Sequence, residues 1–154
     1  MRSVATIIML VLASLPLAAQ EKKEKEIVQT RFGVLPNVEL YPQSEPKELL
    51  NSVVKALQQG RVEYLLAHLT DPSFIESRMR NSNASFSELV EVAKAKLKED
   101  PDLYRSIRII AREGELAEQG DVAMFSQKDF KDRKIFVVKI GQRWFIRNER
   151  TEKK

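Results

Sequence analysis

The chain of 154 residues contains no cysteine, a single histidine and only five glycines. Without cysteine there can be no disulfide, no thiolate zinc site, no iron–sulfur cluster and no cysteine nucleophile. One histidine excludes any metal site that needs several imidazoles, and none of the glycines forms a dinucleotide-binding or phosphate-binding loop. We therefore expect neither a metal nor another cofactor.

The residues that are present have the composition of a water-soluble globular protein. Hydrophobic residues make up 43% of the chain and charged residues 31%, which provides enough apolar material for one packed core. The 26 basic and 22 acidic side chains leave a formal net charge of +4. Because this excess is small and no recognition motif accompanies it, we do not expect nucleic acid as a partner.

The N-terminal residues 1–19 follow the pattern of a secretory signal peptide. Arg2 precedes an apolar run, and Pro16 and several small residues follow it. The apolar stretch of about 16 residues is shorter than the roughly 20 that a membrane-spanning helix needs. We expect cleavage near Gln20, export to the periplasm or out of the cell, and no stable membrane span afterwards. An uncleaved membrane anchor is the alternative.

The next segment, residues 20–43, begins with the charged run EKKEKE and holds apolar residues only in short pieces. We interpret it as a charged tether, which is either solvated or lies as an extended strap along the folded domain. Residues 44–150 then form a single domain, and residues 151–154 form a tail.

Helical periodicity dominates the first half of the domain. Apolar residues recur at helical spacing over residues 49–57, with Ser44 as the expected N-cap and Gly60 as the stop. A second helix is expected over residues 61–71, followed by a short helical piece at 74–79.

A third helix begins at a capping box. Ser85 and Glu88 have the spacing of that motif, and the apolar residues after them keep helical spacing until Asp100-Pro101 ends the helix. From residue 105 onward the apolar residues alternate instead. Strands are predicted at residues 106–112, 122–127, 134–140 and 143–149.

The last two strands are expected to form a hairpin. Gly141 and Gln142 suit a two-residue type II′ turn with glycine first. This turn predicts four cross-strand pairs: Ile140 with Arg143, Lys139 with Trp144, Val138 with Phe145, and Val137 with Ile146.

Helices followed by strands predict an α+β fold, in which N-terminal helices pack on a curved, cone-like antiparallel sheet of four or more strands. Both faces of the predicted hairpin are apolar, whereas a sheet with one wet face would alternate cleanly. We therefore expect the second face to be covered by the preceding segment or by a second copy, which would make a homodimer through the sheet.

Three stretches carry a resemblance to a known superfamily. These are ALQQGRVEYLLAHLTDP at 56–72, QGDVAMF at 119–125 and KIGQRWFIRNE at 139–149. Together they resemble the nuclear transport factor two-like superfamily, also called SnoaL-like or ketosteroid-isomerase-like. The YPQ and PKE pieces at 41–48 and the segment YLLAHLTDP also resemble small exported planctomycete-type proteins of unknown function.

The superfamily resemblance implies a pocket between the helices and the concave face of the sheet. Some members use this pocket for isomerase, cyclase or dehydratase chemistry, and others only for binding or assembly. The acidic residues that its ketosteroid isomerases place inside the cone have no match in this sequence, where the strands contribute mostly basic and apolar side chains.

Tyr64, His68 and Asp71 form the sharpest local combination. On a helix their spacing places them along one side, on the flank away from Leu65 and its apolar neighbours. A carboxylate could orient the imidazole for proton transfer, and the phenol could stabilise an oxyanion. The alternative is that Asp71 belongs to the turn ending the helix, and that the two rings are amphipathic residues at its boundary.

The sheet half of the chain is basic. Residues 105–154 hold 13 basic and 8 acidic side chains, against 12 and 14 in residues 20–104. Arg143 and Arg147 share one strand face and Arg108 and Arg112 are similarly spaced, so the sheet could attract an anionic ligand, or these arginines could form a solvated rim. The ligand-binding candidates are Tyr64, His68, Arg143, Trp144 and Arg147.

These observations favour an exported, non-catalytic binding or assembly module that holds a small apolar or anionic ligand, or that docks on an envelope partner. A small-molecule isomerase or dehydratase using Tyr64 and His68 is the alternative. A structural envelope protein is a third possibility, and it predicts that Trp144 and Phe125 fill the cone.

Overall fold

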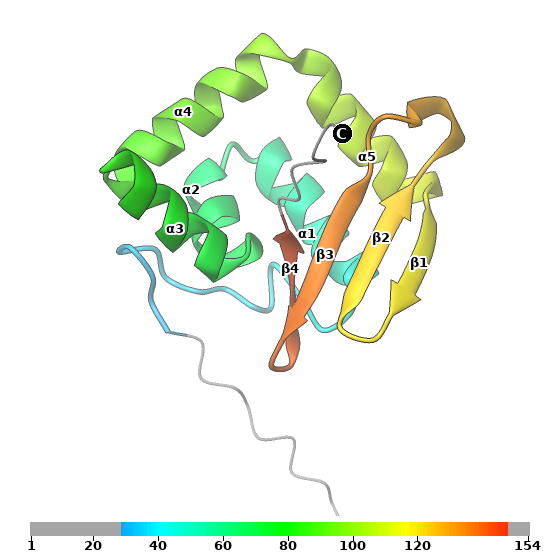
Figure 1. The fold of residues 1–154 in the computed structure, drawn as a ribbon, viewed down its shortest axis with the longest axis horizontal. Helices are drawn as coiled ribbons and strands as arrows, with labels where there is room; N and C mark the ends of the chain where they lie inside the picture. The colour runs from blue at the N-terminus through cyan, green and yellow to red at the C-terminus, as the bar shows by residue number, and fades with distance from the viewer. Residues whose placement is uncertain (1–28, 148–154) are drawn as a thin grey trace, which may run out of the picture.

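The computed structural model describes residues 29–147 of the chain (Figure 1). The predicted signal peptide, the charged run of the tether and the C-terminal tail lie outside these residues. Within the described part, no helix is both long enough and apolar enough to cross a membrane.

Helices precede the sheet, as predicted, and the α+β fold class is confirmed. The helical elements include a π-helical turn, η1, and a short 3-10 helix, η2. In chain order the elements are α1 (Pro46–Gln58), α2 (Val62–Tyr64), η1 (Leu65–Leu69), α3 (Pro72–Ser82), α4 (Phe86–Glu99), α5 (Pro101–Glu113), β1 (Glu115–Gln119), β2 (Val122–Ser126), η2 (Lys128–Phe130), β3 (Ile135–Ile140) and β4 (Arg143–Arg147).

Local capping explains where the helices begin. The predicted capping box at α4 is confirmed, because the Ser85 side chain accepts from the Glu88 amide while the Glu88 carboxylate accepts from the Ser85 amide. The predicted N-cap of α1 was wrong by one position. Proline at the first helical position holds the residue before it extended, so Glu45 is the N-cap, and the Ser44 amide donates to Glu48 Oε2.

Each of the two Asp-Pro pairs begins a helix. The Asp71 side chain accepts from the Ser73 amide at the start of α3, and the Asp100 side chain accepts from the Leu103 amide at the start of α5. The predicted short piece at 74–79 is therefore part of an 11-residue helix.

The predicted strand at residues 106–112 was wrong, because these residues lie within α5. The same residues also fit a helix, in which Ser106 and Ile110, four positions apart, share the buried face and Arg108 between them is exposed. The helix is favoured because Asp100 caps its N-terminus and Pro101 occupies its first position. At its end Gly114 is required, since a Cβ there would collide with the Ile110 carbonyl oxygen.

The sheet is a meander with strand order β1-β2-β3-β4. All four predicted pairs of the β3–β4 hairpin are confirmed, and Gly141 has the positive φ of 64° that the turn requires. The first strand was missed by the sequence analysis. β1 has the sequence ELAEQ and all five residues are exposed, so it carries no apolar alternation.

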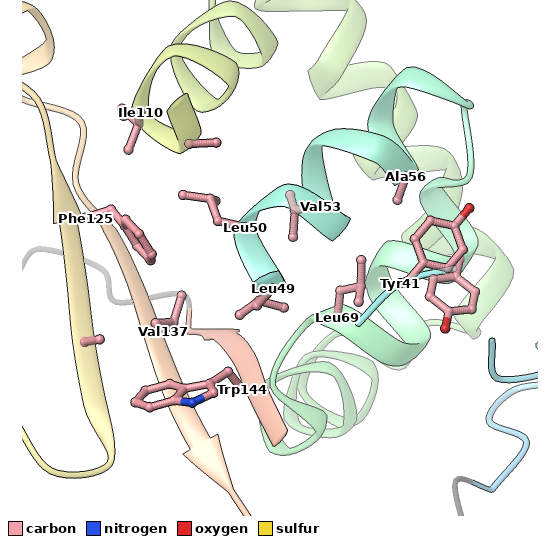
Figure 2. Packing of buried hydrophobic residues seen from close by; sticks show 13 residues of the cluster. Tyr41, Leu49, Leu50, Val53, Ala56, Leu69, Ile110, Phe125, Val137 and Trp144 are labelled. Carbon is pink, nitrogen blue, oxygen red and sulfur yellow. The ribbon is translucent and has the colours of Figure 1, made fainter. Parts of the chain in front are cut away.

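The core lies between one face of the sheet and helices α1 and α5 (Figure 2). Phe125, Val137 and Trp144 project from three neighbouring strands toward Leu50 of α1 and Ile110 of α5. All five side chains are at most 3% exposed. The hydrophobic effect of burying large side chains from both layers is the main stabilising contribution.

The segment before α1, residues 29–44, packs on the domain, and we call it the strap. Its Tyr41 and Gln43 are buried. At its start Arg31 and Val34 pair through two backbone hydrogen bonds around a turn, in which Phe32 and Gly33 both have positive φ. Of the two interpretations of the tether, the packed strap describes this part of the chain.

Candidate functional site

Tyr64 and His68 lie in contact inside the protein. Their ring centroids are 4.9 Å apart, and the Tyr41 ring of the strap packs on Tyr64 with its centroid 4.2 Å away. Tyr64 and His68 are each only 1% exposed. The expectation that they lie on a flank away from the apolar residues was therefore wrong. The chain changes from α-helix to the π-helical turn η1 between them, and Tyr64, His68 and Leu69 are all buried.

Each ring has one hydrogen bond to the strap, and that of His68 fixes its tautomer. The Tyr64 hydroxyl oxygen accepts from the Asn37 amide at 3.0 Å. His68 Nε2 lies 2.9 Å from the Val34 carbonyl oxygen, which can only accept, so Nε2 carries the proton. Nδ1 of His68 is then a bare acceptor, buried and without a hydrogen-bond partner among the described residues.

Burial also moves both titrations away from neutral pH. Desolvation lowers the pKa of His68 below its ordinary value of 6.5, and the nearby Arg143 and Arg31 charges lower it further, against the opposing bond to Val34. Desolvation raises the pKa of the Tyr64 phenol above 10.0. At neutral pH both rings are uncharged.

Asp71 does not orient His68. Its Oδ1 accepts from the Ser73 amide at 2.9 Å and from the Ser73 hydroxyl at 2.7 Å, as the N-cap of α3. Among residues 29–147, the imidazole makes one hydrogen bond, to Val34. The predicted trio is thus divided between a buried ring pair and a helix cap.

Gln43 was not singled out by the sequence analysis, although it joins three parts of the structure. Its Nε2 donates to the main-chain carbonyl oxygens of His68 and Trp144, both at 2.9 Å. The main-chain carbonyl oxygen of Gln43 in turn accepts from the Trp144 amide. Gln43 Oε1 accepts from Arg143 Nη1 at 3.3 Å. A glutamine in a stretch with few apolar residues has no local signal for this role.

The other ligand-binding candidates lie on different sides of the sheet. Trp144 is buried among the core residues where the superfamily resemblance places a pocket. Arg143 packs over the Phe145 ring, with its guanidinium carbon 5.0 Å from the ring centroid, and Arg147 is exposed near the end of β4. No single site contains all five candidates.

A groove of about 640 Å³ lies between α1 and α5. Its cations are Lys47 of α1 and Arg108 and Arg112 of α5, and none of the seven described residues that line it is acidic. Arg112 also pairs with the neighbouring Glu113. Arg108 and Arg112 were predicted to lie on a strand at equal spacing to Arg143 and Arg147; they lie instead on helix α5, where residues four apart also share one face. The groove is completed by Asn51, Val54, Ile109 and Ala111.

A second hollow, at the turn between α3 and α4, has the opposite electrostatic character. It measures about 570 Å³, and Glu88 and Glu91 are its charged residues. In residues 29–147, no group of His, Asp or Glu side chains is placed to hold a metal ion.

Comparisons of the chain with models of protein families, with curated proteins and with solved structures found no match. The resemblance to the nuclear transport factor two-like superfamily therefore stays a prediction.

Proposed function

We propose that the protein is a non-catalytic binding module whose groove between α1 and α5 holds an anionic ligand with an apolar portion. The observation that carries the proposal is a groove lined by three cations and no carboxylate. Such an arrangement concentrates anions, and an arginine guanidinium can bind a carboxylate or phosphate through two parallel hydrogen bonds.

The apolar part of the ligand is inferred from the remaining lining. Val54 and Ile109 are half-buried in the groove, so a hydrocarbon chain could cover them while its head group meets the cations. A volume of about 640 Å³ falls within the range of small-molecule sites. The two helices also pack on the core, which gives the groove a rigid base.

The catalytic alternative requires substrate to reach Tyr64 and His68. At 1% exposure, with the imidazole bonded to the strap, neither ring can contact a substrate in this conformation. This burial supports binding over isomerase or dehydratase chemistry.

Export and dimerisation complete the proposal. Residues 1–19 support export to the periplasm or out of the cell, where the anionic group could be presented by an envelope partner. The sheet face opposite the core supports a homodimer, because Phe136 and Val138 are only half-buried there and Ile140 is 43% exposed.

The test is a titration followed by the backbone amide shifts of α1 and α5. The probe is decanoate below its micelle concentration, with decyl phosphate as a second head group, and decanol and inorganic phosphate as the separate halves. We expect both amphiphilic anions to shift groove amides and to bind more tightly than either half. Shifts confined to other surfaces would contradict the proposal.

Paired variants locate the binding energy. Arg108→Gln with Arg112→Gln should weaken decanoate binding roughly tenfold, the scale of one lost charge-assisted hydrogen bond at an accessible site. The matched control changes two exposed arginines of α3, Arg78→Gln with Arg80→Gln, which lie outside the groove. Equal weakening in both double variants would reduce the interaction to net charge and remove the site.

A further inference from the structure

The strap is held on α2 and η1 by three hydrogen bonds from separate points. Arg31 Nη1 donates to the Ala67 carbonyl oxygen at 2.9 Å, His68 Nε2 donates to the Val34 carbonyl oxygen at 2.9 Å, and the Asn37 amide donates to the Tyr64 hydroxyl at 3.0 Å. Arg31 also pairs with Glu76 of α3 at 3.1 Å. The polar contacts of residues 31–37 are therefore concentrated on one short stretch of the chain, residues 64–68.

Val34 is the one apolar side chain of residues 31–37 that packs, half-buried, against the core cluster. Leu35 is 74% exposed, and Phe32 and Val38 are also exposed. Phe32 stacks on Phe86 of α4 at 4.3 Å, yet its backbone has a φ of 52°, which is costly for a bulky residue. Beyond residue 40, by contrast, the strap is anchored by the buried Tyr41 and Gln43. The outer part, residues 31–37, is therefore held by contacts that differ from those of this anchor.

The hydrogen bond between Val34 of the strap and His68 involves a titratable side chain. A second proton on His68 would reside on Nδ1, which is buried and faces no acceptor among the described residues. The charged groups near the ring are Arg31 of the strap and Arg143 of β4, both cationic, and the ring packed on the imidazole is the uncharged phenol of Tyr64. The carboxylate of Glu76 on α3 is bonded to Arg31.

We propose that His68 is an acid-sensitive latch, whose protonation releases residues 31–37 of the strap from α2 and η1. An imidazolium in the docked state would be buried, unsatisfied at Nδ1 and close to two guanidinium groups. Once the strap lifts, water reaches the ring and satisfies both nitrogens. Acid thus favours the open state.

The direction of the pH effect on strap docking follows from the difference in the proton affinity of His68 between the docked and open states. The pKa of His68 is lowered in the docked state and returns toward 6.5 when the ring is exposed. The docked state is therefore fully favoured above that ordinary value and loses stability as pH falls from it toward the lowered pKa. Within this window, one linked proton raises the ratio of open to docked strap by up to about tenfold per pH unit.

Amide hydrogen exchange on the full chain measures this ratio. The Asn37 amide reports docking directly, because its acceptor is the Tyr64 hydroxyl. After division by the intrinsic exchange rate at each pH, its opening should increase several-fold between pH 7 and pH 5, while the amides of β3 keep their protection. An opening at Asn37 that does not change with pH, or that β3 shares, would overturn the proposal.

Two variants distinguish protonation of His68 from protonation of Glu76 as the cause of strap opening. His68→Gln keeps an N–H donor for the Val34 carbonyl oxygen but cannot be protonated, so its Asn37 opening should be independent of pH. Glu76→Gln removes the ion pair with Arg31 and leaves His68, so the pH dependence should persist. The opposite pattern would place the switch at Glu76.

A second measurement needs no variant. The chain has one histidine, so the imidazole resonances in its NMR spectrum belong to His68 without assignment. We expect a titration midpoint below 6.5 in the wild-type protein, with strap resonances of Val34 and Asn37 following the same curve. A midpoint at or above 6.5, or strap resonances that ignore the curve, would overturn the latch even if His68→Gln failed to fold.

Discussion

The outermost strands of the sheet, β4 and β1, differ in what lies beyond them. Past β4, the Gln43 carbonyl oxygen accepts from the Trp144 amide at 2.9 Å, and the Asp71 amide donates to the Ile146 carbonyl oxygen at 2.8 Å. The strap and the start of α3 thus extend the hydrogen bonding of the sheet. Past β1, no strand of the described part of the chain pairs with the sheet, and all five residues of β1 are exposed.

The two sequences match these two situations. RWFIR in β4 contains three large apolar residues, and an uncovered edge of that kind would pair with other chains. ELAEQ in β1 places Glu115 and Glu118 on a bare edge, where charge discourages such pairing. One edge is covered by the strap and the start of α3, while the charged side chains of the other discourage strand pairing along that edge.

The largest difference between the edges should appear on truncating one apolar side chain in each. Trp144→Ala removes a buried indole from the core, and we expect the free energy of unfolding to fall by about 3–5 kcal/mol. Leu116→Ala on β1, where the side chain is 43% exposed, should cost less than about 1 kcal/mol. Urea denaturation of both variants measures the contrast, and similar losses would refute it.

A smaller effect should follow from removing the polar cover of β4. Gln43→Leu leaves the carbonyl oxygens of His68 and Trp144 without their side-chain donor, at a cost of about 2–3 kcal/mol in unfolding free energy. The matched control is Gln119→Leu at the exposed end of β1, which should change stability by about 0.5 kcal/mol or less. Thermal or urea unfolding distinguishes them, and equal changes would show that Gln43 is not a connector.

Elements with strong local signals were predictable from the sequence. The capping box at Ser85 and Glu88 and the turn at Gly141 involve residues close in the chain, so their geometry follows from residue type alone. The strand predicted at 106–112 failed because its pattern fits two periods, and the decisive cap lies six residues earlier at Asp100. β1 was missed because an exposed edge strand needs no apolar alternation.

The candidate site was less predictable, because its contacts join distant residues. His68 bonds the backbone of Val34, 34 positions away, and a carbonyl oxygen has no signature in a sequence. The spacing of Arg108 and Arg112 did indicate a shared basic face. Lys47, which completes the groove from another helix, could be found only once α1 and α5 were seen to pack together.

The smallest effect on stability, and the most specific to the open edge, should come from removing the charges of β1. Glu115→Thr with Glu118→Thr keeps strand-compatible side chains but deletes the repulsion that protects the edge. We expect the unfolding midpoint to stay nearly unchanged while the protein forms assemblies larger than those of the wild type at the same concentration, as seen by light scattering. The matched control, Glu45→Thr with Glu99→Thr, removes the same charge from exposed positions outside the sheet. If that control associates equally, net charge rather than the edge keeps the chains apart, and the contrast between β1 and β4 would lose its physical basis.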